Sequence, residues 1–565
     1  MWFARPPDYR AAGGPRRDVV AGLTVTVVLI PQAMAYGLLA GVPPVYGLYA
    51  ALLPMLVYTL LGSGPHVNVG PTALASLLCL NGLSGMAEPG TDDYIVLAIT
   101  LAFLTGLLQL AFGVLRLGGL VSLLSRPVLS GFVSAAAVLI VASQVSGLLG
   151  LGMPRTAYLY DTLVAFARHV ANVHPLTALF GAGTLLLLPA GRRWAPRLPT
   201  MLLWVVAATV LVWALRLDRA GLAVVGEVPA GLPNLTLPLV DGGTLLDLLP
   251  VAAVLALISF VETLSIGNAL SARHGYYHIE PNRELLALGT AKVAGAFFAA
   301  VPTSASFGRS AVLEESGGRS PLASLVTVSL LVLVLLVLTP LFYYLPVPVL
   351  AGIIIYSVGK LLDVEEMRRL YRLAPRELAV LLVTFVFTLF AGLQWGIAGG
   401  VVLSLAFVFL RAARPHLAEL GRIPGTNAFR NVNRFTEAEV DPELLIVRFD
   451  AELYFGNAEF FADRILSMAE GRAGLRAVIL DGHTINDLDT TGLYSLEQLH
   501  EKLRHRGVAF YLTGMIGPVR DVLFRSGLMQ RMGVESHFLS IQDAIRYHRG
   551  EDPGRNWDLP AVQHD

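Results

Sequence analysis

Gln32 and Tyr36 stand one helical turn apart in an apolar stretch, directly after Pro31. The proline removes a backbone donor and opens the helix, which frees a carbonyl group near these side chains. An amide and a phenol on one helix face could together hydrogen-bond a polar ligand. The alternative is a proline-kinked helix whose glutamine only bonds a neighbouring helix.

Two Pro-Thr dipeptides, each followed by small residues, predict two short helices near 71–85 and 305–316. A helix that begins inside the bilayer points its free N–H groups into the protein, where they form an anion site. Each such helix end is equivalent to about half a positive charge. The residues at these two ends are Thr72, Ala73, Ala305 and Ser306. The alternative is a helix that simply begins at the membrane surface.

Arg309 and Glu262 are charged residues within hydrophobic stretches. An arginine in such a stretch costs roughly 2.5–3.5 kcal/mol on insertion scales, so a cavity or an anionic partner should offset this cost. A carboxylate near the middle of the membrane is by default a functional group, here a proton acceptor. The alternatives are an arginine that reaches to the membrane surface and a glutamate held in a permanent ion pair.

These groups need a membrane-spanning scaffold, and the sequence supplies one. No Asp, Glu, Lys or Arg occurs from Val19 to Ala87, a run of 69 residues, which is long enough for three crossings of roughly 20 residues each. Further charge-poor stretches continue to about residue 410. Gly and Pro residues divide these stretches into about fourteen segments. We therefore expect a transport domain over residues 15–414.

The distribution of basic residues predicts the orientation. If the N-terminus is cytoplasmic and fourteen spans alternate, inside segments hold nineteen Lys and Arg residues and outside loops hold four. Such an excess marks the cytoplasmic side. We expect both termini inside, with a tail at 1–14 and no cleaved signal peptide. The two short helices then run in opposite directions, as in inverted-repeat transporters. Twelve spans would satisfy the same test.

Composition argues against several other functions. Of 565 residues, 55% are hydrophobic and only 15% are charged, and the formal net charge is zero. Zero net charge argues against a nucleic-acid partner. The single Cys79 allows neither a disulfide nor a thiolate metal site. No P-loop or dinucleotide fingerprint is present, so we expect no cofactor, no ATP-driven transport and no enzyme activity.

From about residue 427 the sequence resembles a soluble domain. Apolar runs at 444–447, 477–480 and 509–512 alternate with helical stretches such as 458–470 and 491–504, which predicts a cytoplasmic α/β domain at 427–550. Thr490 and Thr491 stand at a predicted helix start, either as regulatory hydroxyls or as part of a simple helix cap. We expect residues 551–565 to be a disordered tail.

Together these motifs resemble the sulfate permease family of anion transporters. The run Pro-Gln-Ala-Met-Ala-Tyr-Gly at 31–37 and the run Ala-Gly-Val-Pro-Pro-Val-Tyr-Gly-Leu-Tyr at 40–49 are similar to its signature, as are residues 283–289 and 308–312. The C-terminal domain resembles the STAS domain that sulfate transporters share with anti-sigma-factor antagonists. The resemblance covers about residues 15–550. It implies an α-helical polytopic membrane protein with seven plus seven inverted repeats, divided into a core and a gate.

The resemblance also implies an anion site between the two half-helices. Its residues would be Gln32, Tyr36, Thr72, Ala73, Ala305, Ser306 and Arg309. Glu262 would be the coupling carboxylate, and homodimers are usual in the family. Ile266 stands where sodium-coupled relatives carry a threonine, which favours protons over sodium.

We expect a secondary active anion transporter of the inner (plasma) membrane. It would be a proton-coupled symporter of sulfate or a small dicarboxylate such as fumarate, working by alternating access. The alternatives are sodium-coupled or exchange transport of bicarbonate or chloride, an uncoupled anion channel, and a membrane-anchored signalling scaffold whose C-terminal domain is the active part.

Overall fold

The computed structural model describes Tyr9 and residues 14–119, 125–153, 159–195, 199–238 and 241–551. It forms two compact units, residues 1–404 and 405–565. Of the tails expected at 1–14 and 551–565, only Tyr9, Gly14 and Glu551 lie among the described residues.

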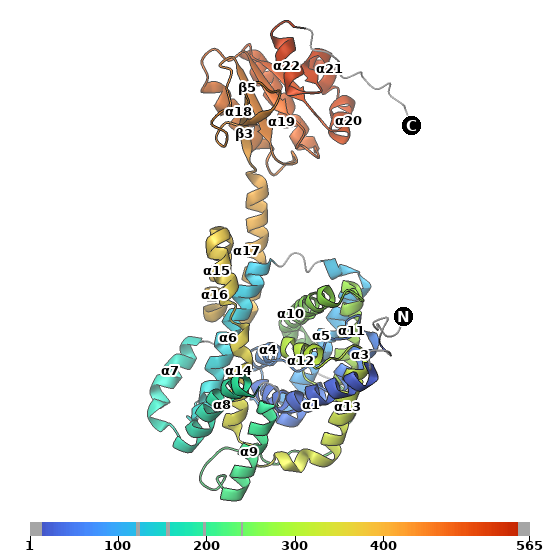
Figure 1. The fold of residues 1–565 in the computed structure, drawn as a ribbon, viewed down its shortest axis with the longest axis vertical. Coiled ribbons are helices and arrows are strands. Elements are labelled where there is room, and N and C mark those ends of the chain that lie inside the picture. The colour runs from blue at the N-terminus through green and yellow to red at the C-terminus, as the bar shows by residue number, and fades with distance from the viewer. Residues whose placement is uncertain are drawn as a thin grey trace. The chain divides into compact units, whose positions relative to one another are not determined.

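The first unit is built almost entirely of helices (Figure 1). Its α-helices are, in chain order, α1 (Gly14–Leu39), α2 (Pro44–Ala50), α3 (Leu53–Leu61), α4 (Ala73–Leu83), α5 (Asp92–Val114), α6 (Arg126–Leu149), α7 (Leu159–His169), α8 (Pro175–Trp194), α9 (Thr200–Leu215), α10 (Gly242–His274), α11 (Pro281–Ala296), α12 (Phe307–Glu315), α13 (Leu322–Leu333), α14 (Val347–Val358), α15 (Val364–Leu373), α16 (Pro375–Ala391) and α17 (Leu393–Ala413), the last of which runs into the second unit.

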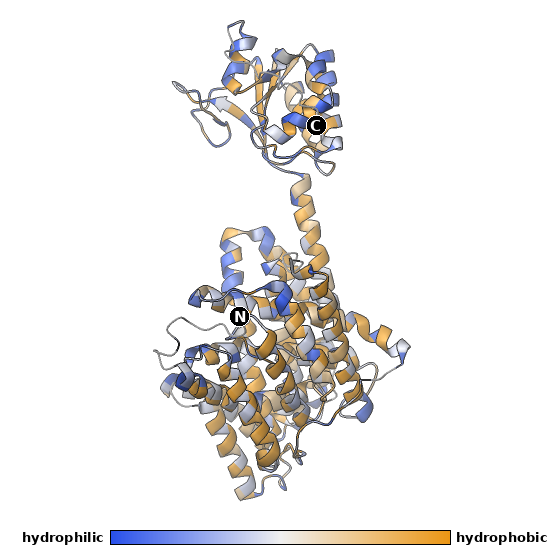
Figure 2. Cartoon of the chain, turned by 90° about the vertical axis from the view of Figure 1, so that its right-hand side faces the viewer, coloured by the Kyte–Doolittle hydropathy of each residue, from blue (hydrophilic) through white to orange (hydrophobic). Residues whose placement is uncertain are grey.

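Many of these helices are apolar enough for a membrane, and Figure 2 shows hydrophobic residues along most of them. Among the described residues, six helical stretches have both the length and the composition to cross a bilayer. They are Gly14–Leu39, Pro44–Leu61, Asp92–Val114, Arg126–Leu149, Gly242–His274 and Leu322–Phe342. Shorter apolar helices, including α4, α9 and α14, accompany them. The total of about fourteen spans stays a prediction.

The helix contacts repeat between the two halves of this unit. Helix α1 packs on α12 and α13, and α10 packs in the corresponding way on α4 and α5. Likewise α6 packs on α16, and α14 packs on α8. If α1, α12 and α13 are taken to correspond to α10, α4 and α5, the same contacts occur in both sets, which is the pattern of an internal repeat. The contacts also group the helices into one bundle around α1, α5, α10 and α11 and a second around α6, α8, α14 and α16, and the two bundles meet where α1 packs on α14 and α4 packs on α6.

Glycine residues allow the closest helix approaches. A Cβ atom on Gly47 of α2 would lie 1.9 Å from the carbonyl oxygen of Ala33 on α1. No side chain fits in that space, so glycine is required where α2 crosses α1. The contact lies next to Gln32 and Tyr36 and fixes the part of α1 that carries them.

Two very short strands connect the halves of the first unit. Strand β1 (Val69–Gly70) pairs antiparallel with β2 (Ser304–Ala305), with Val69 opposite Ala305 and Gly70 opposite Ser304. Each strand leads directly into a short helix, β1 into α4 and β2 into α12. Because the strands are paired, the N-termini of these two helices are brought to one place.

The second unit contains a six-stranded sheet of order β4-β3-β5-β6-β7-β8. Strands β5 to β8 are parallel, while β3 is antiparallel to both of its neighbours. The strands are β3 (Leu417–Arg422), β4 (Phe429–Asn431), β5 (Leu444–Phe449), β6 (Ala477–Asp481), β7 (Ala509–Thr513) and β8 (His537–Phe538). The sheet thus begins at Leu417, ahead of the domain start expected at 427. Strand β3 contains Glu419 and Gly421, so its apolar pattern is weak in the sequence.

Alternation along these strands builds two hydrophobic cores. Leu445, Val447 and Phe449 of β5 join a core with helices on one face of the sheet, whereas Leu444 and Ile446 face the other core. The first core is covered by α18 (Ala458–Glu470), α19 (Thr490–His505), α20 (Gly517–Arg525) and α21 (Leu528–Met532), and the second by α22 (Ile541–His548). The strands and helices predicted between 444 and 512 are confirmed.

Candidate anion-binding site

The two helix N-termini at the strand pair carry matching caps. Thr72 is the N-cap of α4, and its Oγ1 accepts a 3.4 Å hydrogen bond from the backbone N–H of Ala75. Ser306 is the N-cap of α12, and its Oγ accepts a 3.4 Å bond from the N–H of Arg309. The pairing continues beyond the strands, because the N–H of Ser306 donates to the carbonyl of Asn68 at 2.9 Å. The positive ends of both helix dipoles therefore share one location.

Arg309 lies at this junction and is fully buried. Its Nε donates to Asn68 Oδ1 at 2.8 Å, and its Nη1 donates to the carbonyl of Pro71 at 3.0 Å. A Cβ atom on Gly70 would come within 3.1 Å of Nη2, so the guanidinium needs glycine there. The side chain is thus held inside the protein and does not reach to the membrane surface.

Several polar atoms near the junction are buried and have no hydrogen-bond partner among the described residues. They are Arg309 Nη2, Ser76 Oγ on α4 and Thr303 Oγ1 just before β2. Buried polar groups are normally paired, and an unpaired group marks either strain or a missing ligand. One of the three belongs to a cation, which makes an anion the ligand that would satisfy it best.

Glu262 lies on α10 and accepts a short hydrogen bond from Ser304 Oγ of β2. Among the residues that the structure describes, no ion pair to Glu262 is present, so the alternative of a glutamate held in a permanent ion pair is not seen. The carboxylate is half-buried and belongs to a cavity wall. It can therefore be reached by water or protons without any change in the helix packing.

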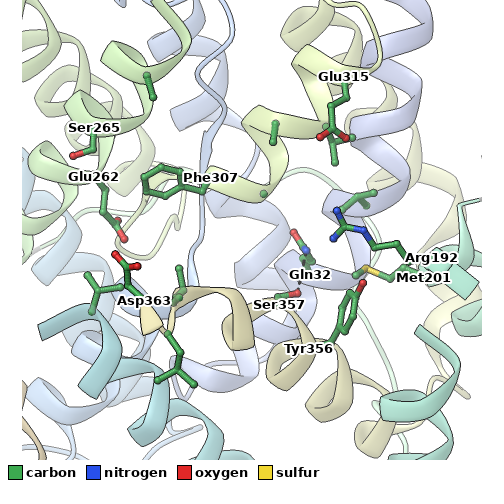
Figure 3. A pocket seen from close by; sticks show the side chains of 18 of the residues that line it. Gln32, Arg192, Met201, Glu262, Ser265, Phe307, Glu315, Tyr356, Ser357 and Asp363 are labelled. Carbon is green, nitrogen blue, oxygen red and sulfur yellow. Dashed lines mark hydrogen bonds between the residues drawn. The ribbon is translucent and has the colours of Figure 1, made fainter. Parts of the chain in front are cut away.

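A cavity of about 1870 Å³ opens beside this carboxylate. Glu262, Gln32 and Ser357 are among the residues that line it, and Figure 3 shows Gln32 next to Ser357 on α14. Arg126 and Arg192 also line it, together with the acidic residues Asp363, Glu365 and Glu366. Its wall is formed by α1, α10 and α12 from one bundle and by α6, α8 and α14 from the other. The cavity thus lies between the two bundles.

Gln32 and Tyr36 face the same partner. The Gln32 Nε2 donates to Ser357 Oγ at 3.3 Å, and Gln32 is only 7% exposed. Tyr36 is buried and interacts with Ser357 as well as electrostatically with Arg309 and Glu262. The two residues therefore bridge the charged groups of one bundle and the α14 helix of the other.

The predicted site residues fall into two groups. Gln32 and Glu262 line the cavity, together with Phe307, Gly308 and Ala311 of α12. The others form the closed junction just behind that wall: Tyr36, Thr72, Ala73, Ala305, Ser306 and Arg309. Arg309 Nη2 is therefore not open to the cavity in this conformation.

Sequence reasoning missed several partners of these residues. Asn68 holds Arg309, Ser304 bonds Glu262, and Ser357 bonds Gln32. Asn68 and Ser304 lie shortly before the two predicted short helices, but neither was expected to act. Lys292, a buried cation on α11, was also missed, although it interrupts an apolar stretch just as Arg309 does.

Thr490 and Thr491 occupy the first turn of α19 and are exposed. The helix is capped by Asp489, whose Oδ1 accepts a 2.7 Å bond from the N–H of Gly492. The cap therefore uses neither threonine hydroxyl, and a regulatory role for them stays a prediction. Within the described residues, no cluster of three His, Cys, Asp or Glu side chains could hold a metal ion.

Comparison with known proteins identifies the family. The model of the sulfate permease family matches residues 16–384, and that of the STAS domain matches residues 436–544. The chain belongs to the sulfate permease family. This family member is 35% identical to a probable sulfate transporter of Mycobacterium tuberculosis, over 94% of this chain and 95% of that protein. It is 34% identical to a chloroplastic sulfate transporter of Arabidopsis thaliana, over 95% of this chain and 81% of that protein.

Solved structures show the same fold for this family member. The murine solute carrier 26 family member A9 anion transporter, described in an inward-facing state, is 26% identical, with a TM-score of 0.85 over 95% of this chain and 92% of that one. The transmembrane domain of a cyanobacterial bicarbonate transporter is 25% identical, with a TM-score of 0.61 over 72% of this chain and 99% of that one. The chain is thus an anion transporter and not an enzyme, with the predicted helical membrane fold and C-terminal STAS domain.

Proposed function

We propose that this transporter is a proton-coupled symporter that carries sulfate or a small dicarboxylate by alternating access. The main support is Arg309, whose Nη2 is buried and unpaired where two helix N-termini meet. A divalent anion is the ligand that a guanidinium and two helix dipoles attract most strongly. Sulfate is further supported by the names of the relatives from Mycobacterium tuberculosis and Arabidopsis thaliana. The proposed anion-binding residues are the seven expected from the sequence: Gln32, Tyr36, Thr72, Ala73, Ala305, Ser306 and Arg309.

Glu262 is the proposed proton carrier. It faces the cavity, accepts a bond from Ser304 and lies in electrostatic range of Tyr36. A neutral Glu262 would reduce the negative charge that accompanies a divalent anion across the membrane. We propose that the bundle holding both half-helices moves against the bundle around α6 and α14, which exposes the site to each side in turn.

We further propose a membrane orientation and an oligomeric state. Arg126 and Arg192 line the cavity and belong to the segments that the positive-inside rule assigns to the cytoplasm. The cavity then opens inward, with both termini cytoplasmic, in the inner (plasma) membrane. The family resemblance favours a homodimer. The proposed domains are the transport domain at 15–414 and the STAS domain at 427–550.

Uptake into liposomes tests this proposal. Purified protein is reconstituted, and labelled sulfate, fumarate, bicarbonate and chloride are offered with a proton gradient, a sodium gradient or neither. We expect an acid outside to drive accumulation of sulfate or fumarate without sodium. Accumulation that requires sodium, anion exchange that ignores the proton gradient, or ion currents without accumulation would each contradict proton symport. An absence of all transport would favour the signalling scaffold.

A further inference from the structure

Lys292 is a buried cation to which the proposed function assigns no role. It lies on α11, is 2% exposed and is one of three lysines in the chain. Its Nζ donates a 2.9 Å hydrogen bond to Gln109 Oε1 on α5, and no ion pair to Nζ is present among the described residues. A buried ammonium with one neutral partner is costly, so an anion within electrostatic range should stabilise it.

The orientation of Gln109 shows that Lys292 acts as a donor. The Gln109 Nε2 donates to the carbonyl of Ala256 and to Ser259 Oγ, both on α10 and both at 2.9 Å. A carbonyl oxygen can only accept, so the amide nitrogen must face α10. The amide oxygen is thereby turned toward Lys292, and the ammonium is tied to the helix that carries Glu262.

Glu262 is the acidic group that interacts with this cation. The two groups interact electrostatically, and Glu262 lies one turn beyond Ser259 on α10. Its other neighbours are Ser304 of β2, which bonds it, and Tyr36 of α1, which interacts with it electrostatically. Lys292 therefore supplies a positive charge within electrostatic range of Glu262 from α11, without a direct ion pair between the two groups.

Close helix packing keeps Lys292 in a fixed position. A Cβ atom on Gly106 of α5 would lie 2.9 Å from both the carbonyl oxygen of Gly289 and the Cβ of Lys292. In return, a Cβ on Gly289 would lie 2.8 Å from the carbonyl oxygen of Gly106. The backbones of α5 and α11 thus meet directly, and Lys292 and Gln109 follow this contact by three residues on their respective helices. The charge must move with the bundle to which both helices belong.

We infer that Lys292 sets the valence of the anion that this transporter moves together with one proton. The inference rests on the proposed function, in which the bundle carries its buried groups across the membrane field. With Glu262 ionised, Arg309, Lys292 and Glu262 sum to one positive charge. The sum covers the groups at the junction and behind it, because two other buried carboxylates of this unit, Asp18 and Glu284, lie near the N-terminal ends of α1 and α11. A divalent anion and a proton on Glu262 make the loaded bundle neutral. Without Lys292, the same neutrality is reached by a monovalent anion and a proton.

Tracer exchange under voltage tests the inference. Liposomes hold equal, saturating sulfate and equal pH on both sides, so that only the loaded carrier moves, and a potassium diffusion potential sets the voltage. We expect the exchange rate of the native protein to change less than twofold between 0 and 100 mV. Lys292→Gln should make exchange strongly voltage-dependent, up to about 50-fold if one charge crosses the whole field. Sulfate uptake relative to chloride should also fall at least tenfold. Lys292→Arg should behave as the native protein.

A second variant tests the charge without changing Lys292. In Glu262→Gln the charges of Arg309 and Lys292 together cancel those of sulfate, so the loaded bundle is neutral only if Lys292 is charged. Sulfate exchange by this variant should therefore be independent of voltage. Voltage-dependent exchange in this variant would overturn the inference even if Lys292→Gln did not fold. Lys502→Gln, which removes an exposed charge from α19, is the matched control.

The outcomes separate this inference from the proposed function. If the native protein shows no proton-driven uptake of a divalent anion, the proposed function fails. If it shows such uptake, and folded Lys292→Gln keeps both its voltage-independent exchange and its preference for sulfate, only the role of Lys292 fails.

Discussion

Arg309 and Asn68 are joined by a 2.8 Å hydrogen bond from the guanidinium Nε to the amide Oδ1, although the two residues lie 241 positions apart. One belongs to the first turn of α12, and the other precedes β1. The bond, with that from Nη1 to Pro71, fixes the guanidinium at the junction of the two half-helices. The charged group of the proposed site is thus held by the opposite half of the transport unit.

Replacing Asn68 with alanine should weaken anion binding. The substitution removes the acceptor of a charge-assisted bond worth about 1.5–3 kcal/mol, and Arg309 would then leave its position. We expect the apparent affinity for sulfate to fall by roughly 10- to 100-fold, measured by isothermal titration or by uptake at varied sulfate. Asn81→Ala, near the C-terminal end of α4 and away from the junction, is the control. Native affinity in Asn68→Ala would show that Arg309 does not need this support.

Gly70→Ala should disturb the same guanidinium sterically. The new methyl group would come within 3.1 Å of Arg309 Nη2, so the side chain must shift away from the junction. We expect sulfate uptake to fall roughly tenfold while the protein remains folded, which corresponds to about 1.4 kcal/mol. Gly85→Ala provides a matched change, since nothing lies within 4 Å of a Cβ there. Equal losses in both variants would argue for a general effect of alanine.

Glu262→Gln should separate anion binding from proton coupling. The amide keeps the shape and can still bond Ser304, but it cannot take up a proton. Uptake should no longer depend on the proton gradient, while sulfate binding should persist. Transport rates at several external pH values, with and without a gradient, measure this. Glu315→Gln, on the cavity wall at the end of α12, should retain the pH response. Proton-driven accumulation by Glu262→Gln would refute the assignment.

Mild acid should destabilise the C-terminal unit through His537. Burial lowers the pKa of this imidazole from 6.5 to about 4, so the unfolded chain binds a proton at a higher pH than the folded domain does. The contribution of neutral His537 to the free energy of unfolding is therefore fully present above pH 6.5. It is lost as the pH falls toward 4, and the total loss is at most roughly 3 kcal/mol. Urea unfolding of a fragment containing the six-stranded sheet, at pH 7.5 and pH 5, measures the loss.

The matched substitutions for this pH effect are His537→Gln and His505→Gln. The first removes the buried titrating group and should flatten the pH dependence of unfolding. The second removes an exposed histidine at the end of α19 and should leave it unchanged. If both variants keep the native pH dependence, another group is responsible for the acid sensitivity.

The sequence by itself determined the features that depend on local chemistry. The charge-free run from Val19 to Ala87 can only be stable in lipid or in a protein interior, so its apolar character predicted the membrane unit. The Pro-Thr dipeptides pointed to the two short helices, but neither proline occupies a first helical turn as expected. Pro71 directly precedes the N-cap Thr72 of α4, and Pro302 lies four residues before the N-cap Ser306 of α12. In the second unit, short apolar runs located β5 to β7, whereas β3 was missed because of its polar residues.

Only the tertiary structure decided which of these groups meet. Asn68 with Arg309, Ser304 with Glu262, and Lys292 with Gln109 are pairs from distant parts of the chain. No local propensity encodes them, because each pair forms only when helices pack at a defined register and distance. Close backbone contacts such as Gly106 against Gly289 set that register. The types of residue in the site were therefore readable from the chain, but their partners and the balance of charge followed from packing.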